Sequence, residues 1–291
     1  MQTKAPKVSV LTPIYNTNPV HLREMIESIL NQTFTDFEFL ILNDSPDNRD
    51  IEKIVLDYAK KDARIKYAKN DKNMGITPSR NKLLKMSRGE YLAIFDHDDI
   101  SVPDRLSRQV AYLDAHPYIG VVSGWLQYFG NDNRLHKTPE YDINIKIMLS
   151  DDCWVAHTAA MIRKSVLIDN NIEYEEFYTP AEDYRLWARL MDVTHFYNLQ
   201  TVLVKYRWTG DNTTVVQSTK MELARLGIAA CICDKHQFLY NTFVKQMLKS
   251  KEQTVGTIFR LRLFGRIPLL KIKNNKIYLF EFIPLLTIKW K

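Results

Sequence analysis

The feature that most constrains this chain is the alternation of short apolar runs with amphipathic segments over its first 125 residues. Five apolar runs have the length of buried strands, at 8–12, 38–43, 65–69, 91–95 and 119–124. Helical spacing of apolar residues predicts helices between them, around 22–30, 50–60, 80–86 and 106–113. Alternating strands and helices predict an α/β fold, with a mostly parallel sheet covered by helices on both faces.

Polar residues follow three of the predicted strands, at Thr12 to Asn16, at Asp44 and at Asp96 to Asp99. In open parallel sheets, ligands bind beyond the carboxyl ends of the strands, so these clusters are expected at one edge. The sequence contains no GxGxxG and no GxxxxGK[ST] loop. Carboxylates repel a phosphate ligand, and the pattern therefore predicts a divalent cation between them and the ligand.

The stretch "IFDHDDISVP" brings three carboxylates together directly after a buried strand. Repulsion makes this arrangement costly unless a cation or a hydrogen-bond network offsets it. The alternative is a surface turn in which Asp99 or Ser101 caps a helix that Pro103 begins.

Length and charge suggest three regions within the 291 residues. We expect a ligand-binding half at 1–125, a second half of the same domain at 126–240, and a basic amphipathic tail at 241–291. From residue 245 onward, eleven Lys or Arg face two acids, a net charge of +9, so the other residues carry −3 of the total +6. The tail has no nucleic-acid-module signature, and we expect no nucleic-acid partner.

The tail also contains an internal repeat, "FGRIPLLKIK" at 264–273 and "FEFIPLLTIK" at 280–289. Cations alternate with large apolar groups here, a pattern typical of segments that lie on anionic membranes. The alternative is that both copies pack on the preceding domain or form a homodimer contact. Proline in each copy argues against one continuous helix.

Three cysteines without metal-type spacing, no signal-peptide apolar core and no membrane-length apolar run predict a reduced, cytoplasmic setting. With a membrane-binding tail, the location would be peripheral, on the inner face of the cytoplasmic membrane.

Four segments carry a resemblance to a known family: VSVLTPIYN, ESILNQTFTDFEFLILNDSPD, NMGITPSRNKLLKMSRGEYLAIFDHDD and AEDYRLWARL. In this order, over residues 7–215, they resemble the family-2 glycosyltransferases with the GT-A fold, a Rossmann-like sheet with a smaller acceptor region. Bacterial enzymes that extend lipooligosaccharide, O-antigen or capsule chains look most similar. The chain departs from the family pattern at Asn43-Asp44-Ser45-Pro46 and at Trp208, where the family often has Asp-Asp-Gly-Ser and histidine.

The resemblance implies a donor site. Asp98 matches the metal ligand of the family's Asp-x-Asp-Asp motif, for Mn²⁺ or Mg²⁺, with Asp96 as a contact to the ribose or the metal and Asp99 orienting the loop. Further matched positions imply nucleotide contacts, at Thr12, Pro13, Tyr15, Asp44 and Arg80. The alternatives from the sequence alone are a cap or turn residue for Asp44 and a solvated helix charge for Arg80.

The resemblance also implies the chemistry. Asp183 matches the carboxylate that deprotonates the acceptor hydroxyl, with Glu182 and His157 as support. The alternatives are two acids that favour a helix N-terminus through its dipole, and a satisfied core histidine.

The implied activity is inverting transfer of a galactose-, N-acetylgalactosamine-, glucose- or N-acetylglucosamine-type sugar. The implied donor is a UDP-sugar, and the acceptor is a lipid-linked or lipooligosaccharide surface glycan. Two other hypotheses are a nucleotidyltransferase on a similar sheet and a non-catalytic module that binds a glycan or nucleotide. The first predicts a glycine-rich basic loop, which "TPIYNTNP" lacks. The second would tolerate loss of Asp98 and Asp183.

Overall fold

The computed structural model describes residues 5–210 and 212–252 and four strands, at 259–263, 267–273, 276–279 and 283–287. Side chains are described from residue 5 to 246, apart from 211 and 214. The strands of the main sheet are β1 Val8–Ile14, β2 Phe37–Asn43, β3 Ile65–Lys69, β4 Tyr91–Ile94, β5 Ile100–Ser101, β6 Ile119–Gly130, β7 Leu135–His136, β8 Met161–Arg163 and β9 His195–Trp208. The α-helices are α1 Pro19–Leu30, α2 Arg49–Ala59, α3 Ile76–Met86, α4 Arg105–Ala115, α5 Asp142–Met148, α6 Lys164–Asp169, α7 Glu182–Leu190, α8 Thr213–Val216, α9 Ser218–Lys235 and α10 Gln237–Glu252, and two 3-10 turns are η1 His157–Ala159 and η2 Glu176–Tyr178.

Within the described residues, nine strands form the main sheet, in the order β3-β2-β1-β4-β8-β6-β9-β5 with β7 beside β6. Strands β1 to β4 are mutually parallel, and β9 is parallel to β6. The short β8 is antiparallel to both of its neighbours, so β6 again runs in the direction of β4. The predicted mostly parallel α/β sheet is confirmed.

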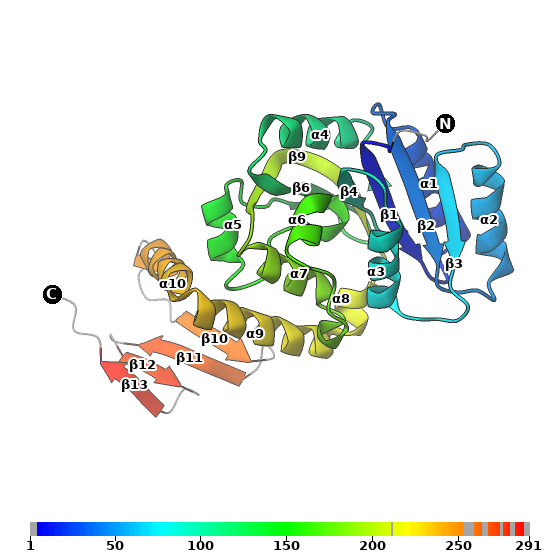
Figure 1. The fold of residues 1–291 in the computed structure, drawn as a ribbon. Coiled ribbons are helices and arrows are strands. Elements are labelled where there is room, and N and C mark those ends of the chain that lie inside the picture. Colours follow the sequence, from blue (N-terminus) through cyan, green and yellow to red (C-terminus); the bar gives the residue numbers. More distant parts are fainter. Residues whose placement is uncertain are drawn as a thin grey trace.

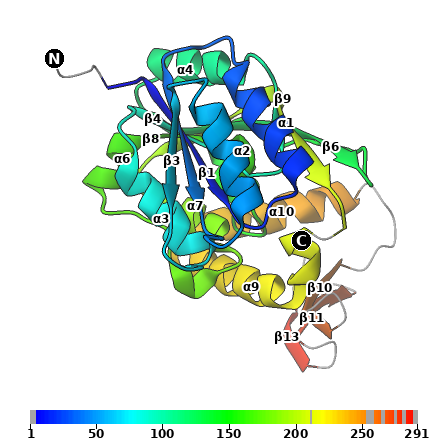
Figure 2. The ribbon, with the colours of Figure 1, turned by 90° about the vertical axis from the view of Figure 1, so that its right-hand side faces the viewer.

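Both faces of the sheet are covered, which explains why its strands read as unbroken apolar runs. Alternate residues of β4 enter different cores: Tyr91 and Ala93 pack with α1, α2 and α4, whereas Leu92 and Ile94 pack with helices that include α3 and α7. Figures 1 and 2 show α1 and α2 on one side of the strands and α3 and α6 on the other. A strand buried on both faces has no solvent-facing position and therefore shows no polar alternation.

Strand β1 runs two residues beyond the predicted end at Thr12. Its pairing with β4 ends at Leu11, while its pairing with β2 continues to Ile14. Pro13 thus lies where one side of the strand has no partner, a position that tolerates a residue without an N–H.

The predicted region boundaries fall inside regular elements. The boundary at 125 lies within β6, and the boundary at 240 lies within α10. No helix in the described part of the chain is both long and apolar enough to cross a bilayer.

The tail repeat coincides with strands of a second, antiparallel sheet of β10 Phe259–Leu263, β11 Ile267–Lys273, β12 Lys276–Leu279 and β13 Ile283–Thr287. Arg262 pairs with Pro268 in the first hairpin, and Tyr278 pairs with Pro284 in the second, at equivalent positions of the sequence repeat. Each hairpin shifts register just before that pair. The repeated unit is therefore a β-hairpin.

Candidate functional site

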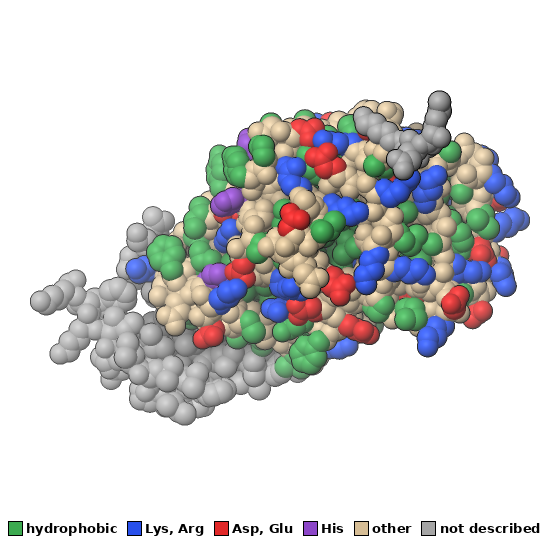
Figure 3. Space-filling model, viewed as in Figure 1, with side chains coloured by type: hydrophobic (Ala, Val, Ile, Leu, Met, Phe, Trp, Pro, Cys, Tyr) green, Lys and Arg blue, Asp and Glu red, His purple; other side chains and the backbone are tan. Residues whose placement is uncertain are grey.

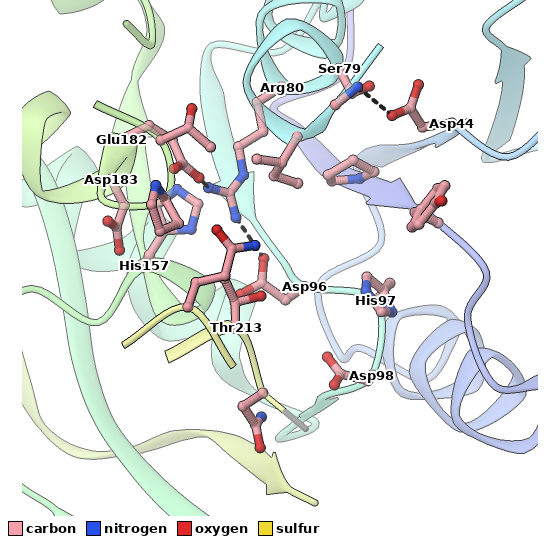
Figure 4. Close-up of a pocket in the computed structure, with 18 of the residues that line it drawn as sticks. Asp44, Ser79, Arg80, Asp96, His97, Asp98, His157, Glu182, Asp183 and Thr213 are labelled. Atoms are coloured by element: carbon pink, nitrogen blue, oxygen red, sulfur yellow. Dashed lines mark hydrogen bonds and ion pairs between the residues drawn. The ribbon is translucent and has the colours of Figure 1, made fainter. Parts of the chain in front are cut away.

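The strand ends converge on a cavity of about 630 Å³, a volume typical of small-ligand sites. Nine of the residues predicted for the site line it: Pro13, Tyr15, Asp44, Arg80, Asp96, Asp98, His157, Glu182 and Asp183. Figure 4 shows Glu182, Asp183 and His157 on one side and Asp44, His97 and Asp98 on the other, with Arg80 and Asp96 between them. The cavity thus brings together acids from segments far apart in the sequence.

Two other predicted residues do not line this cavity. Thr12 is fully buried within β1, and its hydroxyl oxygen is buried without a hydrogen-bond partner. Asp99 is fully buried, although it belongs to the same loop as Asp96 and Asp98, which we call the carboxylate loop (residues 96–99).

Asp99 ties the loop to two other elements. Its carboxylate accepts a 2.8 Å bond from the Thr158 hydroxyl and a 2.9 Å bond from the Arg207 backbone N–H. Burial raises its pKa well above the ordinary value, and the charges of Asp98 and Asp96 add to the rise. The next helix, α4, starts from Asp104 as its N-cap, so neither Asp99 nor Ser101 caps it.

A buried cation lies close to the same loop. Arg105 is fully buried, and its guanidinium donates to the carbonyl oxygens of Ile94 and Ala160. Burial lowers its pKa to about 9, while Asp99 and Asp96 oppose the decrease. The positive charge of Arg105 reduces the repulsion between the Asp96 and Asp99 carboxylates.

Asp98 lines the cavity together with Asp96, the other loop carboxylate that reaches it (Figure 4). Burial raises its pKa; the His97 imidazole opposes the rise, and the Asp96 charge adds to it. The His97 Nδ1 lies 3.1 Å from the Thr17 hydroxyl oxygen, and this contact holds the imidazole ring in place.

The carboxylate oxygens at this edge suit a hard divalent cation, because they are the ligands that Mg²⁺ and Mn²⁺ prefer. Across residues 5–210 and 212–246, no group of three or more His, Cys, Asp or Glu side chains is arranged to hold a metal. One or two carboxylates fit an ion that is completed by substrate phosphates and water, which is the usual way in which Mg²⁺ is bound.

Arg80 connects the two sides of the cavity. Its guanidinium pairs with Glu182, and a second nitrogen lies 3.2 Å from an Asp96 oxygen. The side chain is only 11% exposed, so Arg80 is not a solvated helix charge. This cation links the end of β4 to the start of α7.

Glu182 and Asp183 lie in the first turn of α7. Negatively charged side chains at this end of a helix interact favourably with the helix dipole. Burial raises the pKa of Asp183 to about 7, the Glu182 charge adds to the rise, and Arg80 opposes it. A carboxylate with a pKa near neutrality can accept a proton at physiological pH.

His157 is buried in the cavity wall, and its Nε2 lies 2.9 Å from the Tyr174 hydroxyl. Burial lowers its pKa well below the ordinary value, and Arg80 and Arg105 add to the decrease. The imidazole is therefore neutral and hydrogen-bonded, like a core histidine that also lines the site.

Asp44 has a role that the sequence did not indicate. Its carboxylate accepts from the backbone N–H groups of Met74 and Gly75 at 2.8 Å and from the Asn70 amide at 2.7 Å. It thereby holds the loop that enters α3, whereas Asn48 caps α2.

One wall of the cavity was missed by the sequence reasoning. It consists of Tyr206 and residues of α8, α9 and the segment before them, which are Thr209, Asn212, Thr213, Gln217, Lys220 and Met221. The segment "RWTGDNTT" carries no spacing that would indicate a ligand site. Thr158 and Arg207, which hold the carboxylate loop, were likewise not predicted to do so.

Comparisons of sequence give one consistent result. A family model described as "Glycosyl transferase family 2" matches residues 9–170. An uncharacterized glycosyltransferase of Methanocaldococcus jannaschii is 35% identical over 69% of this chain and 71% of its own length. One from Haemophilus influenzae is 30% identical over 72% of this chain and 68% of its own length.

Comparisons of structure agree with the fold. The crystal structure of S. aureus TarS 1-349 in complex with UDP-GlcNAc has a TM-score of 0.62 at 18% identity, covering 86% of this chain and 76% of that one. The mannosyltransferase PcManGT from Pyrobaculum calidifontis, in complex with GDP-Man and Mn²⁺, has a TM-score of 0.59 at 15% identity, covering 88% and 77%.

Proposed function

The chain belongs to glycosyl transferase family 2, and from this premise we propose that it is an inverting, metal-assisted transferase that uses a UDP-sugar. The sugar is of the galactose, N-acetylgalactosamine, glucose or N-acetylglucosamine type, and the acceptor is a hydroxyl of a surface glycan. The observation that carries the proposal is one cavity lined by Asp96 and Asp98 and also by Asp183 (Figure 4). The UDP-GlcNAc complex of TarS supports the choice of donor.

The donor binds at the strand ends in this proposal. Tyr15, which is 49% exposed beside Pro13 and Asp44, offers a ring face to the base. Asp96 reaches the ribose, and Arg80 provides a cation next to the diphosphate. An Mg²⁺ or Mn²⁺ ion, held by Asp98 with Asp96 beside it, would supply the positive charge that neutralises UDP as it leaves.

Asp183 performs the proton transfer. As the acceptor oxygen bonds to the anomeric carbon, the bond from that carbon to the UDP oxygen breaks, and the hydroxyl proton moves to the Asp183 carboxylate. Inversion requires acceptor and base on the face opposite the leaving group. In Figure 4, Arg80 and Asp96 lie between Asp183 and Asp98, and this separation supports the assignment of Asp183 to the acceptor side in this proposal. The carboxylate charge also favours an oxocarbenium-like transition state.

We further propose that the acceptor is a lipid-linked glycan and that the basic tail brings the enzyme to the inner face of the cytoplasmic membrane. The net charge of +9 from residue 245 onward supports this, because each Lys or Arg near an anionic surface contributes about 1 kcal/mol of attraction.

The test is a screen of UDP-sugars for release of UDP with Mn²⁺ or with EDTA. We expect metal-dependent release with one donor, and a decrease in kcat of about 10²- to 10⁴-fold in Asp183→Asn with UDP affinity retained. The matched control is Asp104→Asn, an exposed carboxylate that pairs with Arg108, which we expect to behave as wild type. Equal UDP affinity with Mn²⁺ and EDTA would refute the metal assignment, and near-normal turnover of Asp183→Asn would refute the base.

A further inference from the structure

The peptide that carries Asp98 is held by a side chain from the far end of β9. The Arg207 Nε donates a 2.8 Å hydrogen bond to the carbonyl oxygen of Asp98, and the Arg207 backbone N–H donates to Asp99. More than a hundred residues separate Arg207 from this loop in the sequence, so the contact exists only because β9 returns beside β5.

Arg207 is itself fixed on two further sides. Its Nη2 lies 2.5 Å from a Glu24 oxygen of α1, and its guanidinium carbon lies 4.4 Å from the centre of the Phe129 ring. Phe129 is the direct partner of Arg207 in the β6–β9 pairing, so this stacking follows from strand register. The side chain is 11% exposed, and an arginine held by ion pair, ring and carbonyl has little rotational freedom.

The hydrogen bond to the Asp98 carbonyl has a consequence for the Asp98 side chain. It fixes the plane of the peptide that follows Asp98, while the carboxylate remains directed to the cavity (Figure 4). Thr158 holds the other flank of the loop, since its hydroxyl accepts from the Asp96 N–H at 3.2 Å. The Arg207 charge also opposes the repulsion between Asp98 and Asp96.

We propose that Arg207, with Glu24 as its counter-ion, is a positioning residue that sets the Asp98 carboxylate for a divalent cation. The inference rests on the proposed function, in which Asp98 is the cation's ligand. Residues that orient metal ligands typically change metal affinity about 10- to 100-fold when mutated.

The experiment measures Mn²⁺ affinity directly, by electron paramagnetic resonance titration of the full chain with UDP present. Arg207→Lys is the main variant: it keeps the charge and the backbone N–H to Asp99 but loses the planar donor to Asp98. We expect the Kd for Mn²⁺ to weaken about 10- to 100-fold, with kcat at saturating Mn²⁺ changed much less. Glu24→Gln, at a 43% exposed site, should weaken the affinity in the same direction but less.

Arg108→Lys is the control, because Arg108 is 48% exposed and forms a surface pair with Asp104. We expect it to bind Mn²⁺ as wild type does. A merely structural role of Arg207 would instead lower the melting temperature and the active fraction without changing the Mn²⁺ Kd, and this result would overturn the inference. Glu24→Gln tests the same contact if Arg207→Lys fails to fold.

Asp98→Asn separates this inference from the proposed function. If Asp98→Asn binds Mn²⁺ as tightly as wild type, the metal assignment itself is wrong. If Asp98→Asn loses Mn²⁺ while Arg207→Lys and Glu24→Gln both retain wild-type affinity, the cation site stands and the role of Arg207 is wrong.

Discussion

At the scale of single residues, the site is governed by how burial and neighbouring charges divide its acids. Glu182 is buried and paired with Arg80, whereas adjacent Asp183 has burial and the Glu182 charge as the main causes of its raised pKa. The two neighbouring carboxylates therefore have different surroundings: Glu182 is ion-paired with Arg80, whereas the pKa of Asp183 is raised to about 7. Such a separation of environments assigns acid and base roles in many active sites.

The raised pKa of Asp183 leads to a prediction about pH. In the proposed mechanism Asp183 must be unprotonated to act as the base. Its pKa is about 7, so kcat/KM should be constant above pH 7 and fall about tenfold per pH unit below it. The measurement is the pH profile of kcat/KM at saturating Mn²⁺. The protonation of the substrate is measured separately over the same pH range. A flat profile between pH 5.5 and 8 would contradict the assignment.

Substitutions of the neighbouring charges should move that profile in opposite directions. Glu182→Gln removes a negative charge that raises the pKa of Asp183, so the ascending limb should shift to lower pH. Arg80→Met removes a cation that lowers it, so the limb should shift to higher pH. The same pH profile measures both shifts, and a shift of both variants in one direction would exclude this electrostatic explanation.

At the scale of elements, the carboxylate loop is placed by the way β4 enters the sheet. The Ser9 hydroxyl accepts from the Gly89 N–H at 2.8 Å and donates to Glu38, and Glu38 also accepts from Arg88. This buried network fixes the register of β4 against β1 at the strand starts. Asp96 and Asp98 follow at the other end of the same strand, so an error in register would displace the site.

Gly89 allows this close approach and provides a stability test. A Cβ at Gly89 would lie 2.5 Å from the Ser9 backbone nitrogen and 2.7 Å from the Val8 carbonyl carbon, neither of which can move easily. Gly89→Ala should therefore destabilise the fold by about 1–3 kcal/mol, measured as a decreased urea midpoint.

The matched control for this change is Gly227→Ala. Gly227 lies inside α9, and an added Cβ meets no atom within 4 Å. This substitution should stabilise the helix by roughly 0.5–1 kcal/mol because alanine favours helix more than glycine does. Equal urea midpoints for the two variants would show that the contact between Gly89 and β1 is not tight.

At the scale of the whole molecule, the charge is divided between the catalytic part and the tail. Figure 3 shows Lys and Arg mixed with Asp and Glu over the drawn face of the described residues, in agreement with the small net charge of −3 up to residue 244. The proposed attraction to an anionic surface therefore depends on the charge of the tail.

The tail proposal predicts that the full chain sediments with anionic vesicles at low salt, and less so at high salt because ions screen surface charges. A chain ending after Glu252, which retains α10, should remain in the supernatant. Neutral phosphatidylcholine vesicles are the control. Equal sedimentation of both chains, or none of the full chain with anionic vesicles, would contradict the proposal.

The sequence by itself determined the elements and the edge at which the site forms. Alternating apolar runs specify buried strands, and the chain direction of parallel strands places Pro13, Asp44 and Asp98 at one edge, where the structure has them. These are local consequences of periodicity and of the way parallel sheets are built. The family's motifs, being short and continuous in sequence, could be recognised in the same way.

Only the tertiary structure decided which groups meet across the sheet. The contacts of Arg80 with Glu182 and of Arg207 with Asp98 each join residues about a hundred positions apart. Asp44 holds the loop before α3, and residues of α8 and α9 line one wall of the cavity. Both depend on how segments without apolar periodicity pack on the sheet. Burial and charge proximity, which set the pKa of Asp183, are properties of that packing, and no local pattern in the chain encodes them.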